Sequence, residues 1–454
     1  MKLGRLAAAT LTLAAVSLGA CERSTLQSPP FARQGPAPTV PNAPRQGAPA
    51  PQTQPLPPPP PSPPSPAEAQ GPSLPPGSKV PVALLLPLTG RDAALGADLL
   101  DAAQLAVFEA ADDLFQLLPR DTEANPDGAR AAADQALNDG ARLILGPVFA
   151  ADVRAASPVA ASRGVGMIAF SNDRTAARAG TYLIGVAPDE QIRRVVGFAS
   201  AQGFKRFAAL VPEGEFGNRV NDALRRAVAQ RGGQLVAVSN YGGDGDIDGV
   251  VRRLANFDER HAAMERERQE LAAKDDEASR AALKRLGNAE TVGEVGFDAL
   301  LIPEGGARLA AIAPLLGYYD IDRTKVKVLG LTTWEAPNLG REPSLVGAWY
   351  VAPVTTGREG FESRFRAAYG RAPHPLSRLA YDATALAALL ARNKPGADFS
   401  AQALTAPSGY LGAGGIFRFL PSGESETGLA VYEVTSTGAR VVDPAPDSFM
   451  AVTQ

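Results

Sequence analysis

Residues 80–106 read V-P-V-A-L-L-L-P-L-T-G-R-D-A-A-L-G-A-D-L-L-D-A-A-Q-L-A. The first seven form a short apolar run, which is typical of a strand buried on both faces. The loop 87–90 follows, and apolar residues then recur three or four positions apart, at Leu95, Leu99, Ala102, Ala103, Ala106 and Ala110. That spacing predicts an amphipathic helix directly after the strand.

The same order of strand, loop and helix repeats along the chain. The predicted strands are 115–118, 143–145, 165–170, 207–211, 234–238, 299–302 and 325–329. The predicted helices are 127–138, 152–163, 189–202, 217–231, 247–255 and 307–316. Such alternation predicts an α/β fold with parallel sheets covered by helices on both faces. Because the helix at 189 starts a second series, we expect two lobes.

Composition excludes several classes of protein. The chain has 454 residues, more than one core usually organises, and its 45 Lys and Arg nearly balance its 48 Asp and Glu. A net charge of −3 argues against a nucleic-acid-binding surface. A single cysteine rules out an intrachain disulfide and a cysteine-based zinc cluster.

The amino terminus has the parts of an export signal. Lys2 and Arg5 precede an uncharged, mostly apolar run over 6–16, which is shorter than the roughly 20 residues that span a bilayer. We therefore expect a signal peptide over 1–20. The sequence Leu18-Gly19-Ala20-Cys21 resembles a bacterial lipobox, and this resemblance implies that Cys21 carries the lipid anchor of a periplasmic lipoprotein. By the same resemblance, Glu22 after the cysteine favours the outer membrane. The alternative to a lipobox is an ordinary signal peptide with an incidental cysteine.

Residues 21–78 are expected to form a disordered, Pro-rich tether. The segment from Pro29 to Gly77 holds 20 of the 40 prolines in the chain. Proline lacks an N–H donor and fixes φ, so neither a helix nor a sheet ladder is expected there. At about 3.1 Å per residue the extended segment would reach roughly 150 Å. It is either a spacer that holds the body away from a membrane or a passive linker.

The body, residues 79–443, resembles type I periplasmic binding proteins of the leucine/isoleucine/valine kind. The matching pieces are L-P-L-T-G at 86–90, D-A-A-Q-L-A at 101–106, N-D-G at 138–140, L-G-P at 145–147, A-F-S-N-D at 169–173 and A-Y-D-A at 380–383. The resemblance implies two Rossmann-like lobes joined by three crossovers, with a ligand cleft between them. Lobe one would comprise 79–188 and 354–413, and lobe two 189–353 and 414–443.

In amino-acid-binding members of this family, groups after the L-G-P strand hold the substrate carboxylate, and aromatic and acidic groups of lobe two hold the rest. The candidate ligand-binding residues implied here are Phe149, Ala150, Ser171, Phe216, Glu304, Thr333 and Trp334. The loop after Pro147 lacks the expected Ser or Thr, so the carboxylate side has lost hydroxyl donors. Glu335 follows Trp334 where the acidic group is expected. Alternatively, these residues simply line the surface or cap helices.

A narrower resemblance is to the carboxy-terminal domain of penicillin-binding-protein activator lipoproteins. It is carried by L-L-L-P-L-T-G-R-D-A-A-L-G at 84–96 together with the pieces at 101–106 and 169–173. This resemblance implies a lipid-anchored protein that stimulates a peptidoglycan synthase, although a Pro-rich segment replaces the helical-repeat domain of the best-known members. The alternative is the substrate-binding component of a branched-chain amino-acid ABC transporter.

The remaining motifs predict no chemistry. Asp244–Gly249 resembles the opening of a calcium loop, but Arg252 and Ala255 stand where further ligands are needed, so a helix cap by Asp246 or Asp248 is expected. Residues 256–292 form a charged helical insertion, either a solvated helix or a docking arm. Phosphate-loop and nucleophile-elbow motifs are missing. We therefore predict a protein that is not an enzyme, without catalytic residues, metal or cofactor.

Overall fold

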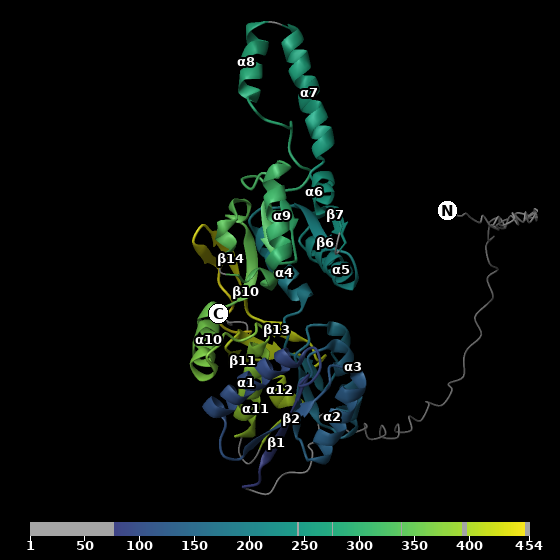
Figure 1. The fold of residues 1–454 in the computed structure, drawn as a ribbon, viewed down its shortest axis with the longest axis vertical. Coiled ribbons are helices and arrows are strands. Elements are labelled where there is room, and N and C mark those ends of the chain that lie inside the picture. Colours follow the sequence, from purple (N-terminus) through teal and green to yellow (C-terminus); the bar gives the residue numbers. More distant parts are fainter. Residues whose placement is uncertain (1–76, 243–244, 275, 337, 393–396, 450–454) are drawn as a thin grey trace, which may run out of the picture. The chain divides into compact units, whose positions relative to one another are not determined.

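The computed structural model describes residues 77–449, apart from 243–244, 275, 337 and 393–396. The predicted signal peptide, Cys21 and almost all of the predicted tether lie outside the described residues. The described part contains two large sheets with helices on both faces, which confirms the expected α/β, two-lobed class (Figure 1). Each strand and helix predicted between 80 and 329 has a counterpart within three residues of its expected bounds.

Lobe one is built on a five-stranded parallel sheet in the order β2-β1-β3-β4-β5. The strands are β1 (Val80–Leu86), β2 (Phe115–Asp121), β3 (Leu143–Leu145), β4 (Gly166–Ala169) and β5 (Thr181–Leu183). Its main helices are α1 (Ala93–Ala110), α2 (Pro126–Asn138), α3 (Ala150–Ser162) and α11 (Ser377–Ala391). Successive residues of β1 face opposite sides: Leu84 packs with α1 and α11, and Leu85 packs with α2 and α3. This double burial explains why β1 is almost uniformly apolar.

Lobe two is built on a seven-stranded sheet in the order β15-β14-β10-β9-β8-β6-β7. The strands are β6 (Arg206–Pro212), β7 (Gln234–Tyr241), β8 (Ala299–Leu301), β9 (Lys327–Gly330), β10 (Trp349–Pro353), β14 (Leu429–Thr435) and β15 (Gly438–Asp443). One face is covered by α4 (Pro188–Ala201) and α5 (Glu215–Gln230), and the other by α6 (Ile247–Leu254) and α9 (Gly306–Tyr318). Strands β6 to β10 run parallel to one another, β14 runs antiparallel to β10, and β15 runs antiparallel to β14.

A glycine near the start of the helix that follows the first strand serves the same purpose in both lobes. A Cβ on Gly96 of α1 would lie 2.0 Å from the carbonyl oxygen of Pro87, and one on Gly217 of α5 would lie 1.7 Å from that of Pro212. Only glycine allows each helix to approach the loop that ends the preceding strand so closely. These contacts place the starts of α1 and α5 beside the carboxyl ends of β1 and β6.

Residues 410–427 form a third, antiparallel sheet with the strands β11 (Tyr410–Gly412), β12 (Gly415–Phe419) and β13 (Ser425–Thr427). We expected residues 414–443 to belong to lobe two as a whole, and this was wrong for 415–427. Phe417 and Phe419 pack in the same core as Leu84, and the Leu183 N–H donates to the Gly423 carbonyl at 2.9 Å. After this third sheet, the chain therefore returns to lobe two only at β14.

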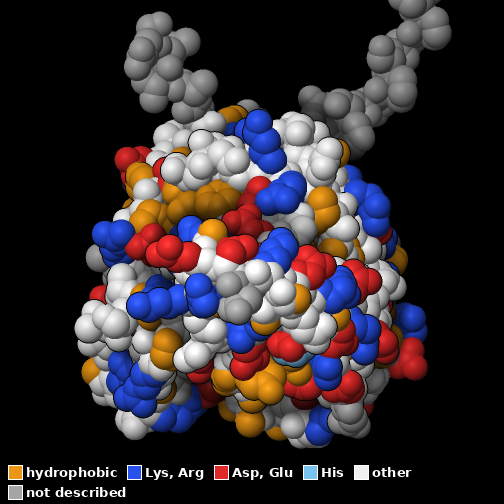
Figure 2. Space-filling model, turned by 90° about the horizontal axis from the view of Figure 1, so that it is seen from above, with side chains coloured by type: hydrophobic (Ala, Val, Ile, Leu, Met, Phe, Trp, Pro, Cys, Tyr) orange, Lys and Arg blue, Asp and Glu red, His pale blue; other side chains and the backbone are white. Residues whose placement is uncertain are grey.

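The charged insertion is a pair of helices, α7 (Phe257–Lys274) and α8 (Glu277–Leu286), that lie alongside each other (Figure 1). Asp276 begins α8 by accepting a hydrogen bond from the Ser279 N–H at 2.7 Å. At the start of α6, Asp246 accepts one from the Gly249 N–H at 2.8 Å, which confirms the predicted cap. On the face seen in Figure 2, acidic and basic side chains are interspersed, as the near-neutral composition leads one to expect.

The remaining long helix is α10 (Thr355–Tyr369). Short helices connect the larger elements, and they are α12 (Ala401–Leu404), η2 (Arg174–Ala176), η3 (Thr332–Trp334), η4 (Leu339–Arg341) and η5 (Pro343–Leu345). The phenylalanines of α10 pack beside α1 of lobe one. Within the described residues, no helix combines the length and apolarity needed to cross a bilayer.

Candidate functional site

Three of the candidate residues follow adjacent strands of lobe one. Phe149 and Ala150 begin α3 after β3, and Ser171 follows β4. The two loops touch because the Phe170 N–H donates to the Pro147 carbonyl at 3.0 Å. Phe149 precedes α3 without a side-chain cap, as its apolar ring requires. The amino end of α3 therefore presents backbone N–H groups without a hydroxyl beside them.

Ser171 is buried, and its hydroxyl accepts a hydrogen bond from the Asp173 N–H at 3.1 Å. Asp173 in turn accepts hydrogen bonds from the N–H and the hydroxyl of Thr175 at 3.1 and 2.9 Å. Burial opposes ionisation of Asp173, but these hydrogen bonds and the charge of Arg219 together hold its pKa below the usual range. Ser171 thus shapes a turn that presents an ionised carboxylate.

Three candidates of lobe two meet around the loop after β8. The Thr333 hydroxyl donates to the Pro303 carbonyl at 2.6 Å, and the Trp334 indole donates to the Ile302 and Glu304 carbonyls, both at 3.0 Å. The Glu304 carboxylate accepts a hydrogen bond from the Tyr241 hydroxyl at the end of β7. Burial and the hydrogen bond to this carboxylate raise the pKa of the tyrosine. Glu304 is therefore anchored on the sheet.

Trp334 lies in the core and has no exposed surface. Its ring lies against Gly330, where a Cβ would come within 2.2 Å of the indole. The Trp334 side chain thus contacts the sheet instead of solvent, and it holds the loop after β8 against the end of β9. Phe216 is half-buried at the start of α5, where it packs against the core between α4, α5 and the sheet.

Two ion pairs join lobe-one and lobe-two elements. Arg219 of α5 lies 3.0 Å from Asp173, and Glu335, directly after η3, is paired with Arg358 in the first turns of α10. Burial raises the pKa of Glu335 even though the guanidinium groups of Arg358 and Arg378 oppose that shift. The carboxylate expected to hold a ligand cation is thus already bound to an arginine of this chain.

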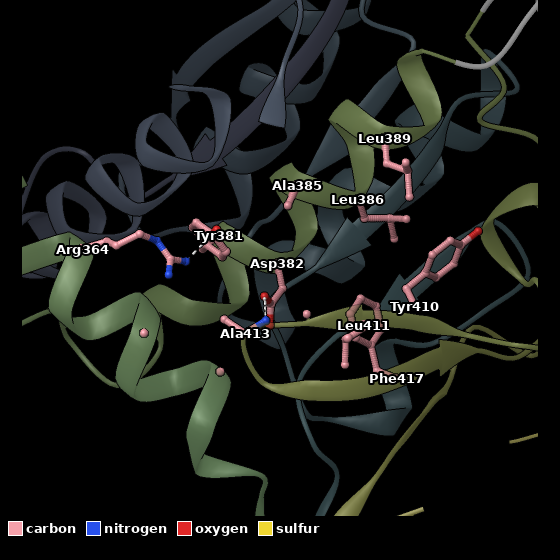
Figure 3. A pocket seen from close by; sticks show the side chains of 13 residues that line it. Arg364, Tyr381, Asp382, Ala385, Leu386, Leu389, Tyr410, Leu411, Ala413 and Phe417 are labelled. Carbon is pink, nitrogen blue, oxygen red and sulfur yellow. Dashed lines mark hydrogen bonds between the residues drawn. The ribbon is translucent and has the colours of Figure 1, made fainter. Parts of the chain in front are cut away.

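A separate cavity of about 410 Å³ lies in lobe one between α10, α11 and β11 (Figure 3). At its floor, buried Asp382 accepts hydrogen bonds from the Ala413 and Gly414 N–H groups at 2.6 and 3.0 Å. Arg364 and Tyr381 lie on one side, and the exposed side chains of Leu389 and Leu411 on the other. Of the seven candidate residues, none lines this cavity.

A family model described as periplasmic binding protein matches residues 79–258, which comprise the first segment of lobe one and the start of lobe two. Solved structures of such proteins cover both lobes. The chain has the type I periplasmic binding protein fold.

Three solved structures illustrate the likeness. An ABC transporter substrate-binding protein from Sphaerobacter thermophilus shares 17% identity with a TM-score of 0.61, covering 82% of this chain and 98% of that one. The branched-chain amino acid transporter substrate-binding protein from Streptococcus pneumoniae, in complex with isoleucine, shares 16% (TM-score 0.52; 81% and 100% covered). A solute-binding protein of an ABC transporter from Rhodopseudomonas palustris, in complex with 3,4-dihydroxybenzoic acid, also shares 16% (TM-score 0.54; 81% and 98% covered).

An uncharacterised protein of Rickettsia prowazekii is 22% identical over 179 residues. The match covers 39% of this chain and 48% of that protein, so the chain spans about half the length of the curated relative it matches.

Sequence reasoning did not find the two ion pairs between the lobes. Asp173 stands in the A-F-S-N-D piece, but nothing near it in the sequence points to Arg219, 46 positions further on. The sequence marks Glu335 as an acidic group, but it does not single out Arg358, which lies in a helix with two other arginines. Among the described residues, no group of three or more His, Cys, Asp or Glu side chains is arranged to hold a metal ion.

Proposed function

We propose that this protein is a non-enzymatic, lipid-anchored binding protein of the bacterial envelope, and that it acts on a protein partner instead of delivering an amino acid to a transporter. The observation that carries this proposal is the ion pair between Glu335 and Arg358. When a zwitterionic amino acid is bound, its ammonium group loses most of its water and needs an acidic group of the protein as a partner. Here the acidic group placed by the resemblance is neutralised from within the chain.

The loops expected to hold the carboxylate of an amino-acid ligand support the same conclusion. The amino end of α3 follows Val148, Phe149 and Ala150, which contribute no hydroxyl. Ser171, the nearest candidate hydroxyl, accepts a hydrogen bond from the Asp173 N–H, which ties its side chain into the turn.

The partner that best fits this architecture is a peptidoglycan synthase, as in penicillin-binding-protein activators. What supports it is the similarity of the 84–96 segment to those lipoproteins, the predicted anchor at Cys21 and the Pro-rich tether of 21–78. A protein held by a lipid and a long spacer can reach a partner across the periplasm.

The second candidate is the substrate-binding component of a branched-chain amino-acid transporter. It is favoured by the fold, which the Streptococcus pneumoniae protein uses to bind isoleucine, and by the position of Phe216 at the start of α5. Phe149, Ala150, Ser171, Glu304 and Thr333 would then face the ligand.

A thermal-shift series distinguishes the two candidates. A ligand at 100 times its Kd stabilises a protein by about 2.7 kcal/mol, which is easily measured as a rise in Tm. We expect no rise with leucine, isoleucine, valine or the other standard amino acids, and we expect crosslinking in cells to recover a peptidoglycan synthase. A rise with any branched-chain amino acid would contradict the first proposal and support the second.

The anchor is tested separately. A Cys21→Ala variant should lose its lipid and move from the membrane fraction to the soluble periplasmic fraction. A Ser24→Ala variant, three residues beyond the cysteine, is the control and should stay with the membrane. Retention of an unacylated Cys21→Ala protein in the membrane fraction would contradict the proposed lipidation.

A further inference from the structure

A second cavity, of about 470 Å³, lies in lobe two, away from the loops that carry the candidate residues. Its walls come from α4, from Arg231 just after α5, from the crossover at Thr427 that leads into β14, and from the segment after β15. The volume falls within the range of 300–1,000 Å³ that is typical of small-molecule sites. Three arginines, Arg193, Arg194 and Arg231, line it.

One of these arginines is fully engaged by the protein. Arg194 donates to the Leu429 carbonyl at 2.8 Å, the Asp443 carboxylate at 2.6 Å and the Pro444 carbonyl at 3.1 Å. It therefore holds α4 against the crossover and cancels the charge of Asp443. The wall of the cavity is built around this pair.

The other two arginines are exposed. Among the described residues, neither Arg193 nor Arg231 forms a side-chain hydrogen bond or an ion pair shorter than 4.0 Å. The Arg231 guanidinium lies beside Gly197 of α4, where a Cβ would come within 3.2 Å of its Nη2 atom. A glycine at this position leaves room for the guanidinium against the helix.

A buried carboxyl group completes the cavity. Glu190 is only 7% exposed, and its Oε1 accepts a hydrogen bond from the Thr427 N–H at 2.5 Å. Its Oε2 is buried without any hydrogen-bond partner in the described residues, which is costly for a polar atom. Burial raises the pKa of Glu190 to about 7, despite the Thr427 hydrogen bond and the charge of Arg193. Because Oε2 is shielded from solvent, the protonated carboxyl form is favoured there.

We propose that this cavity binds the phosphate group of a small organic phosphate. Two unpaired guanidinium groups match the two negative charges of a phosphate monoester, and each can donate two parallel hydrogen bonds to its oxygens. A carboxylate ligand would neutralise only one of the two arginines.

The proposal is independent of the proposed function, because none of the candidate residues of that function lines the cavity. Its phosphate could come from a soluble metabolite or from a phospholipid headgroup. Since Glu190 joins α4 to the crossover at Thr427, an occupant would contact segments that connect the two lobes.

The test uses the full chain with Cys21 replaced by Ser and measures the binding of glycerol 3-phosphate and inorganic phosphate by calorimetry at constant ionic strength. We expect Arg193→Ala and Arg231→Ala each to weaken binding at least tenfold, and Arg231→Lys to weaken it less. Arg225→Ala removes an exposed arginine of α5 outside the cavity and should change the affinity less than twofold. Glu190→Gln keeps the size of the side chain and the acceptor for the Thr427 N–H, so it should retain binding.

A second arm tests sedimentation with vesicles containing phosphatidylglycerol. Binding of glycerol 3-phosphate that depends on both arginines assigns the site to a soluble phosphate, and vesicle binding alone, lost in both variants, assigns it to a lipid headgroup. Two results would overturn the proposal: no binding of any of these probes, or binding that Arg193→Ala and Arg231→Ala leave unchanged while their circular dichroism shows an intact fold.

Discussion

Arg219 of α5 lies 3.0 Å from the carboxylate of Asp173, so an ion pair joins the loop after β4 in lobe one to the helix after β6 in lobe two. Arg154 of α3 lies 3.7 Å from the same carboxylate. The carboxylate is mostly buried, whereas about a third of the Arg219 side chain is exposed. The pair therefore holds the loop after β4 of lobe one against helix α5 of lobe two.

Removing this pair should weaken the contact between the lobes. An exposed or half-exposed ion pair is worth about 0.5–1 kcal/mol, so Arg219→Ala should weaken the contact between the two lobes by about that amount. Spin labels placed on α3 and α5 would report the weaker contact as a broader distance distribution. Arg225→Ala, on the exposed side of the same helix, is the control. A distribution that is identical in the two variants would show that the pair does not hold the lobes together.

The pair between Glu335 and Arg358 makes a different prediction. Arg358→Ala leaves a largely buried carboxylate without its partner, which should reduce the free energy of unfolding by about 2–3 kcal/mol at pH 8. The loss should be smaller at pH 5, because protonation of Glu335 removes the unpaired charge. Urea denaturation at both pH values measures this difference.

The double variant Arg358→Ala/Glu335→Gln is the matched control for that experiment. It removes the charge together with its partner, so it should be more stable at pH 8 than Arg358→Ala alone. If the two variants unfolded at the same urea concentration, the ion pair would not be the reason for the loss.

Asp382 should be essential for the turn between β11 and β12. Its carboxylate accepts hydrogen bonds from two buried N–H groups, those of Ala413 and Gly414. Asp382→Ala leaves both unsatisfied and should cost about 2–4 kcal/mol of unfolding free energy. Asp382→Asn keeps one acceptor oxygen and should cost clearly less. Equal losses in the two variants would mean that side-chain volume, and not hydrogen bonding, stabilises this turn.

Glu190 should make the protein less stable as the pH rises. Its pKa is about 7 in the folded protein, above the value of 4.5 expected in the unfolded chain. The folded state therefore holds the proton more tightly, and its contribution to stability is complete below about pH 4.5 and is lost as the pH rises to 7. The difference amounts to about 3 kcal/mol.

Glu190→Gln removes this titration while keeping an acceptor for the Thr427 N–H. Urea denaturation between pH 4.5 and 8 should therefore show that the variant gains stability relative to the wild type as the pH rises. A constant difference between the two proteins across this range would contradict a raised pKa at Glu190.

Much of the fold follows from local patterns. The apolar run at 80–86 predicted β1, and the three- and four-residue spacing from Leu95 onward predicted α1, because a strand buried on both faces and a helix buried on one leave distinct periodicities. Asp246 was expected as a cap since a helix start depends on residues only three positions apart. Such features need no knowledge of distant parts of the chain.

The arrangement of the candidate site residues is decided by packing between segments that are distant in the sequence. Trp334 was a ligand candidate in the sequence, but in the structure its ring fills the space over Gly330 inside the core. Phe417 and Phe419 alternate as in any strand, and only the packed structure shows that they face the core of lobe one. Arg219 and Arg358 meet their carboxylates because sheet order and helix placement bring together side chains that no local pattern connects. Within the part of the chain that the structure describes, Arg193 and Arg231 form no ion pair. Periodicity along a chain reports which face of an element is buried, whereas the partners of a charged group depend on what the rest of the protein places against that face.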